Sequence, residues 1–152
     1  MEKIASFCID HEKLKPGLYL SRRDGDVDTY DLRFYKPNGG VYLSNGVLHS
    51  FEHLFATILR NGPQKKSIVY FGPMGCRTGF YLLVRNLKPE PFILEVRRAL
   101  LEMRDYQGEL PGVTAQECGN YMEHDLPGAK KEAARYLSII AEWRNENLNY
   151  PK

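Results

Sequence analysis

Polar and apolar residues alternate along the early part of the chain with the period of a β-strand. Two runs of strand-type residues, 18–23 and 27–35, flank Asp24-Gly25, and Asp-Gly between two such runs is a strong hairpin signal. In the second run apolar and polar residues take turns, which is typical of a half-buried strand. We therefore expect an antiparallel hairpin in which Asp31 and Arg33 share one face, and the pattern alone favours a solvated Arg33.

Three later segments carry apolar residues at helical spacing instead. The first begins after Ser44 or Asn45, either of which can cap a helix, and Asn61-Gly62-Pro63 ends it. The second is expected from residue 89 to about residue 106. The third is expected to follow Pro127-Gly128 and to end at about residue 147.

The remaining apolar runs complete the expected fold. Residues 68–71 and 79–84 should form two more strands, separated by a glycine-rich break that carries Cys76. The elements then follow in the order strands, helix, strands, helix, loop, helix. This order favours an α+β fold, with an antiparallel or mixed β-sheet packed with helices. The length favours one domain, residues 1–152, which starts with a polar arm of about 16 residues.

Charge and cysteine content narrow the class of protein. The chain has 21 Lys and Arg against 19 Asp and Glu, without a basic or acidic block, which predicts no nucleic-acid or membrane partner. No apolar run reaches the ~18 residues of a membrane span, and the first residues lack the apolar stretch of a signal peptide. Three well-separated cysteines argue against a disulfide framework. We therefore expect a soluble cytoplasmic protein with free thiols.

The first predicted helix carries the clearest chemical signal. His49 and His53 are one turn apart and therefore share a face, with Glu52 beside them and Arg60 further along the same strip. The opposite face is apolar and can pack on a core. A single histidine is most often structural, but two at this spacing with an inserted glutamate favour a metal site with a free carboxylate for proton transfer.

Two histidines leave a divalent ion short of ligands. Cys118 and Cys76 are the best candidates for a third ligand, followed by His11 and His124. Two imidazoles and a thiolate suit zinc or ferrous iron, and such a site is suited to Lewis-acid chemistry at a carbonyl or hydroxyl oxygen.

Two other functions fit the same helix. His-x-x-Glu-His is also the inverted zinc-peptidase motif, in which Glu52 would activate water in a metal-dependent hydrolase. A non-enzymatic metal-binding module is the other alternative, and it would have four protein ligands and no open position.

Several stretches taken together resemble the S-ribosylhomocysteine lyase family, whose product is the precursor of autoinducer-2. The resemblance spans nearly the whole chain. One position differs, because this chain has Tyr70 where many relatives have an Asp. The matching stretches, in chain order, are Ser6-Phe7 with Asp10-His11, Asp31-Leu32-Arg33-Phe34 with Pro37-Asn38, His49-Ser50-Phe51-Glu52-His53-Leu54, Pro73-Met74-Gly75-Cys76-Arg77-Thr78-Gly79-Phe80-Tyr81, and Glu117-Cys118-Gly119-Asn120-Tyr121 with His124-Asp125-Leu126.

The resemblance implies a metal centre and a pair of proton-transfer groups. One ferrous ion per subunit would be held by His49, His53 and Cys118, with zinc or cobalt as possible substitutes. Cys76 and Glu52 would be the general acid/base pair. The implied reaction converts S-ribosylhomocysteine to homocysteine and 4,5-dihydroxy-2,3-pentanedione.

The resemblance also implies a binding site for the substrate and a homodimer. Ser6, His11 and Arg33 match positions associated with substrate, and Arg60, on the metal face of the helix, is a further candidate. Family members are homodimers with the active sites at the subunit interface. The N-terminal arm is therefore expected to line the partner's site.

Overall fold

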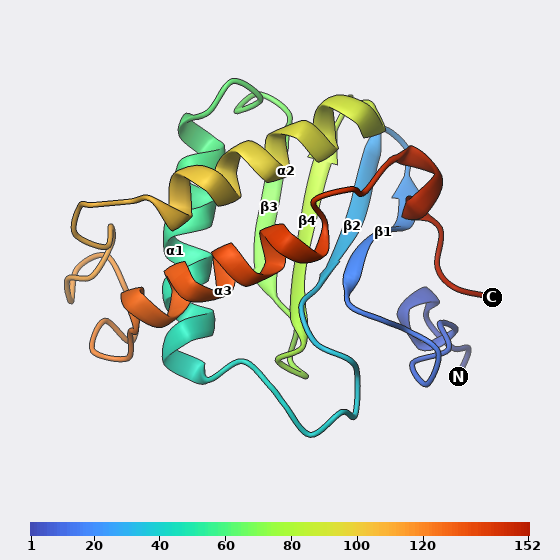
Figure 1. The fold of residues 1–152 in the computed structure, drawn as a ribbon, viewed down its shortest axis with the longest axis horizontal. Helices are drawn as coiled ribbons and strands as arrows, with labels where there is room; N and C mark the ends of the chain where they lie inside the picture. Colours follow the sequence, from blue (N-terminus) through green and yellow to red (C-terminus); the bar gives the residue numbers. More distant parts are fainter.

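A four-stranded antiparallel sheet and three helices make up the protein in a computed structural model that describes all residues, 1–152 (Figure 1). The strands lie side by side in the order β1-β2-β4-β3. Every neighbouring pair is antiparallel, so the expected α+β fold is confirmed and the sheet is not mixed. The elements are β1 (Gly17–Asp24), β2 (Val27–Arg33), α1 (Asn45–Asn61), β3 (Ile68–Pro73), β4 (Gly79–Arg85), α2 (Pro89–Arg104), α3 (Leu126–Ile139) and the short 3-10 helices η1 (Ala5–Phe7) and η2 (Asn145–Leu148).

Local sequence explains where most elements begin and end. The β1–β2 turn is Gly25-Asp26, one residue beyond the expected turn, and Gly25 has the positive φ of 63° that a two-residue hairpin turn requires. Ser44 caps α1, because its hydroxyl accepts a hydrogen bond from the backbone N–H of Val47.

The last helix is shorter than its apolar spacing predicted, since α3 ends at Ile139 and not near residue 147. Arg97 of α2 donates hydrogen bonds to the backbone carbonyl oxygens of Ile140 and Trp143, at 2.9 and 2.6 Å from Nη2. The indole of Trp143 in turn donates to the carbonyl of Leu18. These contacts with neighbouring elements bend the chain away from the helix axis.

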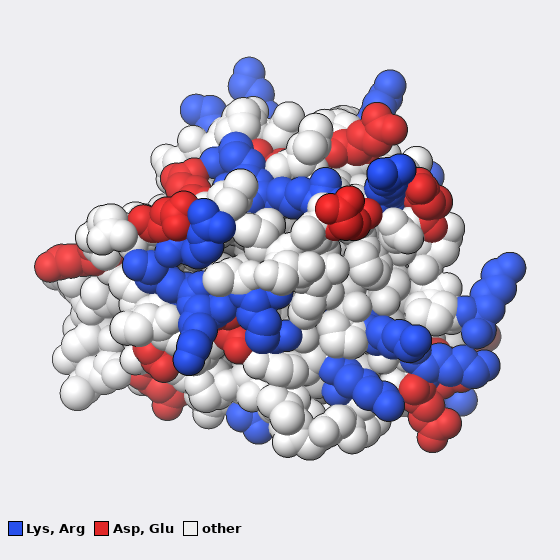
Figure 2. All heavy atoms as spheres, viewed as in Figure 1, with Lys and Arg blue, Asp and Glu red and all other residues white.

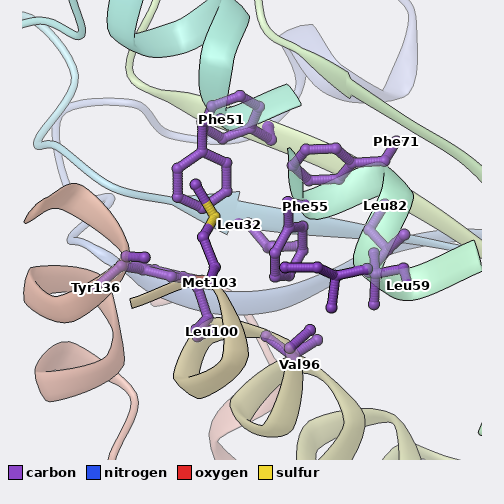
Figure 3. Close-up of a cluster of buried hydrophobic side chains, with 14 of the residues drawn as sticks. Leu32, Phe51, Phe55, Leu59, Phe71, Leu82, Val96, Leu100, Met103 and Tyr136 are labelled. Atoms are coloured by element: carbon purple, nitrogen blue, oxygen red, sulfur yellow. The ribbon is translucent and has the colours of Figure 1, made fainter. Parts of the chain in front are cut away.

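The three helices cover one face of the sheet, and the core lies between them (Figure 1). Figure 3 shows side chains of α1, α2 and α3 meeting those of β2 and β4 there. Basic and acidic side chains are interspersed on the helix face, as the balanced composition predicts (Figure 2). None of the helices has the length and apolar content required to cross a membrane.

The other face of the sheet has no α-helix over it, and Ser6 of η1 lines a pocket there. Asp31 and Arg33 of β2 point to this face, as the alternation predicted, but Arg33 is only 2% exposed. The expectation of a solvated Arg33 is therefore wrong. The carboxylate of Asp31 balances the charge of Arg33 in a buried ion pair, and segments far away in the sequence cover both residues. Both ends of the chain lie beside β1, which is an edge strand of the sheet (Figure 1).

Candidate metal centre and thiol cavity

Helix α1 presents its two histidines on the side turned away from the core. The buried side of the helix packs Phe51, Phe55 and Leu59 into the core. The rings of His49 and His53 are nearly perpendicular, with centroids 4.6 Å apart. One helix therefore anchors the site in the core and exposes two imidazoles to the loop that connects α2 to α3.

Carbonyl groups of that loop orient both imidazoles. Nδ1 of His49 lies 2.9 Å from the carbonyl oxygen of Glu123, and Nδ1 of His53 lies 3.0 Å from that of Pro111. A carbonyl can only accept, so each Nδ1 carries a proton, and in the neutral ring the lone pair is then on Nε2. This tautomer is the one that metal-binding histidines need, and carbonyls outside the ligand shell commonly fix it.

Cys118 completes the arrangement from the loop. Its sulfur lies 3.4 Å from Nε2 of His49 and 3.8 Å from Nε2 of His53. The backbone N–H of Asn120 donates a hydrogen bond to the same sulfur, which stabilises a thiolate. Cys118 is held in place because its own N–H donates to the carbonyl of Thr114 at the start of a tight turn.

His124 is the fourth member of the cluster, although it ranked behind the cysteines as a candidate ligand. It stacks on His49 with ring centroids 4.0 Å apart, and its Nδ1 lies 3.1 Å from the hydroxyl of Ser50. Its Nε2 is buried and has no hydrogen-bond partner. Burial, and then the neighbouring His49 and His53, lower the pKa of His124, which favours a neutral ring.

These four side chains fit a borderline divalent ion. One ligand atom from each of the four, His49, His53, Cys118 and His124, lies within 4.8 Å of the others. Three imidazoles and a thiol are the donor set that zinc or ferrous iron prefers. The buried Nε2 of His124, which has no hydrogen-bond partner in the chain, also fits a site that binds an ion.

Glu52 and Arg60 lie on the same helix but outside the cluster. Glu52 is half-buried and makes no hydrogen bond or ion pair within the chain, so its carboxylate is free. Arg60 donates to the carbonyl of Val69 on β3 and lies roughly 10 Å along the helix axis from His53. Its assignment to the substrate stays a prediction.

Cys76 lies elsewhere, on the tight turn that joins β3 to β4. The N–H of Arg77 donates to the carbonyl of Met74 across the turn, and Met74 pairs with Gly79 at its base. The side chain of Cys76 is exposed, so it is not the small buried hydrophobic residue that isolated cysteines usually are.

A cavity of about 320 Å³ opens beside this thiol. Residues of the N-terminal arm, of β2 and of β4 meet there. Three of the four predicted substrate residues, Ser6, His11 and Arg33, therefore lie together with Cys76 of their own chain. The cavity is lined by Ser6, Phe7, His11, Arg33, Pro73, Met74, Gly75, Cys76 and Tyr81.

Arg33 carries the positive charge of this cavity. Its Nε and Nη2 donate to the two carboxylate oxygens of Asp31 at 3.1 and 2.7 Å, and its Nη1 lies 3.9 Å from the sulfur of Cys76. Burial acts to lower the pKa of Arg33, but the carboxylate of Asp31 outweighs burial and raises it. The guanidinium stays charged and can stabilise a thiolate on Cys76.

The predicted site residues thus fall into two groups within one chain. None of the four clustered metal-type residues lines the cavity of Cys76, and Cys76 is not part of the cluster. We call the first group the metal half, which is His49, His53, Cys118 and His124 with Glu52. We call the second the thiol half, which is Cys76, Arg33, Ser6 and His11.

The chain is similar to enzymes of one family along its whole length. The family model described as S-ribosylhomocysteinase (LuxS) matches residues 4–147. An S-ribosylhomocysteine lyase of Borreliella afzelii is 44% identical over 157 residues, which cover 99% of this chain and 100% of that protein. A protein of the same name from Phocaeicola vulgatus is 46% identical, over 99% of this chain and 98% of its own length. Another from Finegoldia magna is 44% identical over the full length of both chains.

Proposed function

The chain belongs to the S-ribosylhomocysteinase (LuxS) family, and we propose that it cleaves S-ribosylhomocysteine to homocysteine and 4,5-dihydroxy-2,3-pentanedione, the precursor of autoinducer-2. The observation that carries this function is the metal half, because its three histidines and its thiol lie together in a chain that matches the lyases along nearly its whole length. The chain is a carbon–sulfur lyase, and its family membership disfavours both the peptidase and the non-enzymatic alternatives.

The reaction is a series of proton transfers followed by an elimination. The ring-opened sugar has its carbonyl at carbon 1 and its thioether at carbon 5. A proton moves from carbon 2 to carbon 1 and then from carbon 3 to carbon 2, which brings the carbonyl to carbon 3. Loss of the proton on carbon 4 then expels homocysteine as its thiolate from carbon 5, and the resulting enol tautomerises to the dione. No oxidant or reductant is required.

Cys76 and Glu52 supply and remove these protons in the proposal. Cys76 is exposed to the cavity and lies next to a buried guanidinium that favours its thiolate form. Glu52 has no partner within the chain, so its carboxylate is available as the second group. Ser6, His11 and Arg33 line the same cavity as Cys76 and bind the substrate there.

One ferrous ion per subunit is the proposed cofactor, held by His49, His53 and Cys118. Zinc or cobalt can take its place, because imidazole and thiolate ligands suit all three ions. When bound, the ion supplies Lewis-acid stabilisation of negative charge on the sugar oxygens.

The two halves support a homodimer with shared sites. The metal half and the thiol half are separate groups in one chain, whereas the reaction needs both at one sugar. The face of the sheet opposite the three α-helices has no α-helix over it, and Tyr70 of β3 is 54% exposed. In a two-fold dimer each complete site takes its metal half from one chain and its thiol half from the other.

The proposal extends to the compartment and to the domain. Three free cysteines suit a reducing cytoplasm. Residues 1–152 act as one domain, because a single cluster of 27 buried residues joins the sheet with all three helices.

Thiol release tests the proposed function against its rival. Protein purified without oxygen should release homocysteine from S-ribosylhomocysteine, detected with a disulfide reagent, and should not cleave a mixture of unstructured peptides. The Cys118→Ala variant is the control, because it should retain the fold and lose the reaction. Peptide cleavage without thiol release would favour the metallohydrolase and contradict the lyase.

A further inference from the structure

A buried chain of polar contacts runs from the C-terminal segment to Cys76, and the proposed chemistry assigns no role to most of it. It begins at Tyr150, passes through Asp31 and Arg33, and reaches Cys76 both directly and through Thr78. Asp31, Arg33 and Thr78 are each at most 2% exposed. Buried polar groups cost free energy unless they are paired, so such a network is ordered only when every member has its partner.

Asp31 is the centre of the network and needs all of its partners. Its carboxylate is fully buried and accepts three hydrogen bonds, two from Arg33 and one of 2.8 Å from the hydroxyl of Tyr150. Tyr150 follows the last 3-10 helix and stacks on Tyr19 of β1, with ring centroids 5.1 Å apart. Burial, and then the charge of Asp31, raise the pKa of Tyr150, so its hydroxyl keeps the proton that it donates.

Thr78 connects the network to the sulfur, and its hydrogen bond with Arg33 has only one possible direction. Nη1 of Arg33 lies 2.7 Å from the hydroxyl oxygen of Thr78, and a guanidinium can only donate. The hydroxyl of Thr78 therefore accepts from Arg33 and keeps its own proton available. When Cys76 is a thiolate it can only accept, so the Thr78 hydroxyl donates to the sulfur, which lies 3.1 Å away. A hydrogen bond donated to sulfur, together with a nearby positive charge, stabilises the thiolate over the thiol.

We propose that Tyr150 and Thr78 are positioning residues for the reaction, Thr78 acting directly on the Cys76 sulfur and Tyr150 acting through Asp31 and Arg33. The hydroxyl of Tyr150 donates to Oδ2 of Asp31 and holds the carboxylate in place. Nε and Nη2 of Arg33 then stay on Asp31, and Nη1 faces Thr78 and Cys76. Neither residue lines the cavity of Cys76. The inference rests on the proposed function only in that Cys76 moves protons there.

Ionisable side chains from every neighbouring element face the network. Burial raises the pKa values of the tyrosines that surround Asp31, so these side chains stay neutral near pH 7. The groups that face the network are Tyr19 from β1, Asp31 and Arg33 from β2, Tyr81 from β4, Tyr136 from α3, His11 from the N-terminal arm and Tyr150 from the C-terminal segment.

The test measures the reactivity of Cys76 separately from lyase activity. Metal-loaded protein is treated with iodoacetamide at a series of pH values, and mass spectrometry follows alkylation of the peptide that contains Cys76. Thr78→Val should slow alkylation near neutral pH by roughly tenfold, and Tyr150→Phe by roughly threefold, because the first removes the bond to sulfur and the second acts at a distance. Both should move the half-maximal rate to higher pH.

Two matched variants control for structural damage. Thr78→Ser keeps the hydroxyl and should restore most of the reactivity that Thr78→Val loses. Tyr35→Phe removes a tyrosine–carboxylate hydrogen bond of the same kind, from Tyr35 to Glu132 at 2.6 Å, and should leave the alkylation curve unchanged. With substrate, Thr78→Val and Tyr150→Phe should lower kcat and leave KM nearly unchanged.

Alkylation curves of Thr78→Val and Tyr150→Phe that coincide with that of the unaltered protein would overturn the inference. A change in Thr78→Val alone would overturn it for Tyr150, which would then only anchor the C-terminal segment. Altered alkylation in a protein that releases no homocysteine would leave the positioning network in place and contradict the proposed function instead.

Discussion

At the residue scale, Cys118 and Cys76 have different surroundings and therefore different expected roles. Cys118 lies 3.4 and 3.8 Å from imidazole nitrogens whose lone pairs are free, whereas Cys76 lies beside a guanidinium and a hydroxyl. Cys118→Ala should therefore lose most of its bound metal, and Cys76→Ala should keep the metal and lose thiol release. Metal content after gel filtration, measured by mass spectrometry, checks both. Equal loss from the two variants would mean that the roles are wrongly assigned.

Glu52 gives a second prediction at this scale. Glu52→Gln keeps the size of the side chain and removes the base, so homocysteine release should fall by roughly 100-fold or more. Metal content should not change, because Glu52 lies outside the cluster of ligand atoms. A variant that loses the ion along with activity would make Glu52 a ligand rather than a proton-transfer group.

At the element scale, the sequence predicted the parts of the fold that depend on local pattern. The hairpin, the capped helix α1 and the line of apolar residues along α2 were all expected. The end of α3 and the burial of Arg33 were not, because both depend on residues distant in sequence. These are Arg97 on α2 for the end of α3, and the N-terminal arm for Arg33.

The same distinction applies to the site. The spacing of His49 and His53 reveals a metal-type pair, because both lie on one helix. The thiol partner could be selected only by resemblance, and His124 lies 74 residues beyond its hydrogen-bond partner Ser50. Thr78 and Tyr150 showed no local pattern of their own, since their roles arise from burial against β2.

Helix α2 offers a test of the core that the site rests on. Leu100 is fully buried in the core and Leu101, its neighbour, is 42% exposed. Leu100→Ala should lower the free energy of unfolding by ~2–5 kcal/mol, whereas Leu101→Ala should change it by less than ~1 kcal/mol. Urea denaturation of both variants, with metal bound, measures the difference. Similar losses of unfolding free energy in the two variants would contradict the assignment of Leu100 to the core.

At the scale of the whole molecule, the separation of metal half and thiol half predicts how two inactive chains complement each other. A Cys118→Ala chain co-expressed with a Cys76→Ala chain, each with its own purification tag, should form a hybrid with one intact site. That hybrid should have about half the activity of the unaltered dimer. If each site came from a single chain, both sites of the hybrid would be inactive.

The N-terminal arm supplies the matched control for this experiment. Ser6 and His11 share the cavity of Cys76 in their own chain, so deleting residues 1–11 damages the thiol half. A hybrid of this deletion with Cys76→Ala should therefore stay inactive. Recovery of activity in this pair would place the arm in a different site from Cys76.

The most direct measurement for the central claim is a titration of ferrous ion into metal-free protein without oxygen, with homocysteine release from S-ribosylhomocysteine as the readout. The metal half predicts that activity rises in proportion to added ion and stops rising at about one ion per chain. Cys118→Ala should show no such rise at the same concentrations. Homocysteine release by the metal-free protein, or a titration that Cys118→Ala reproduces, would contradict the account.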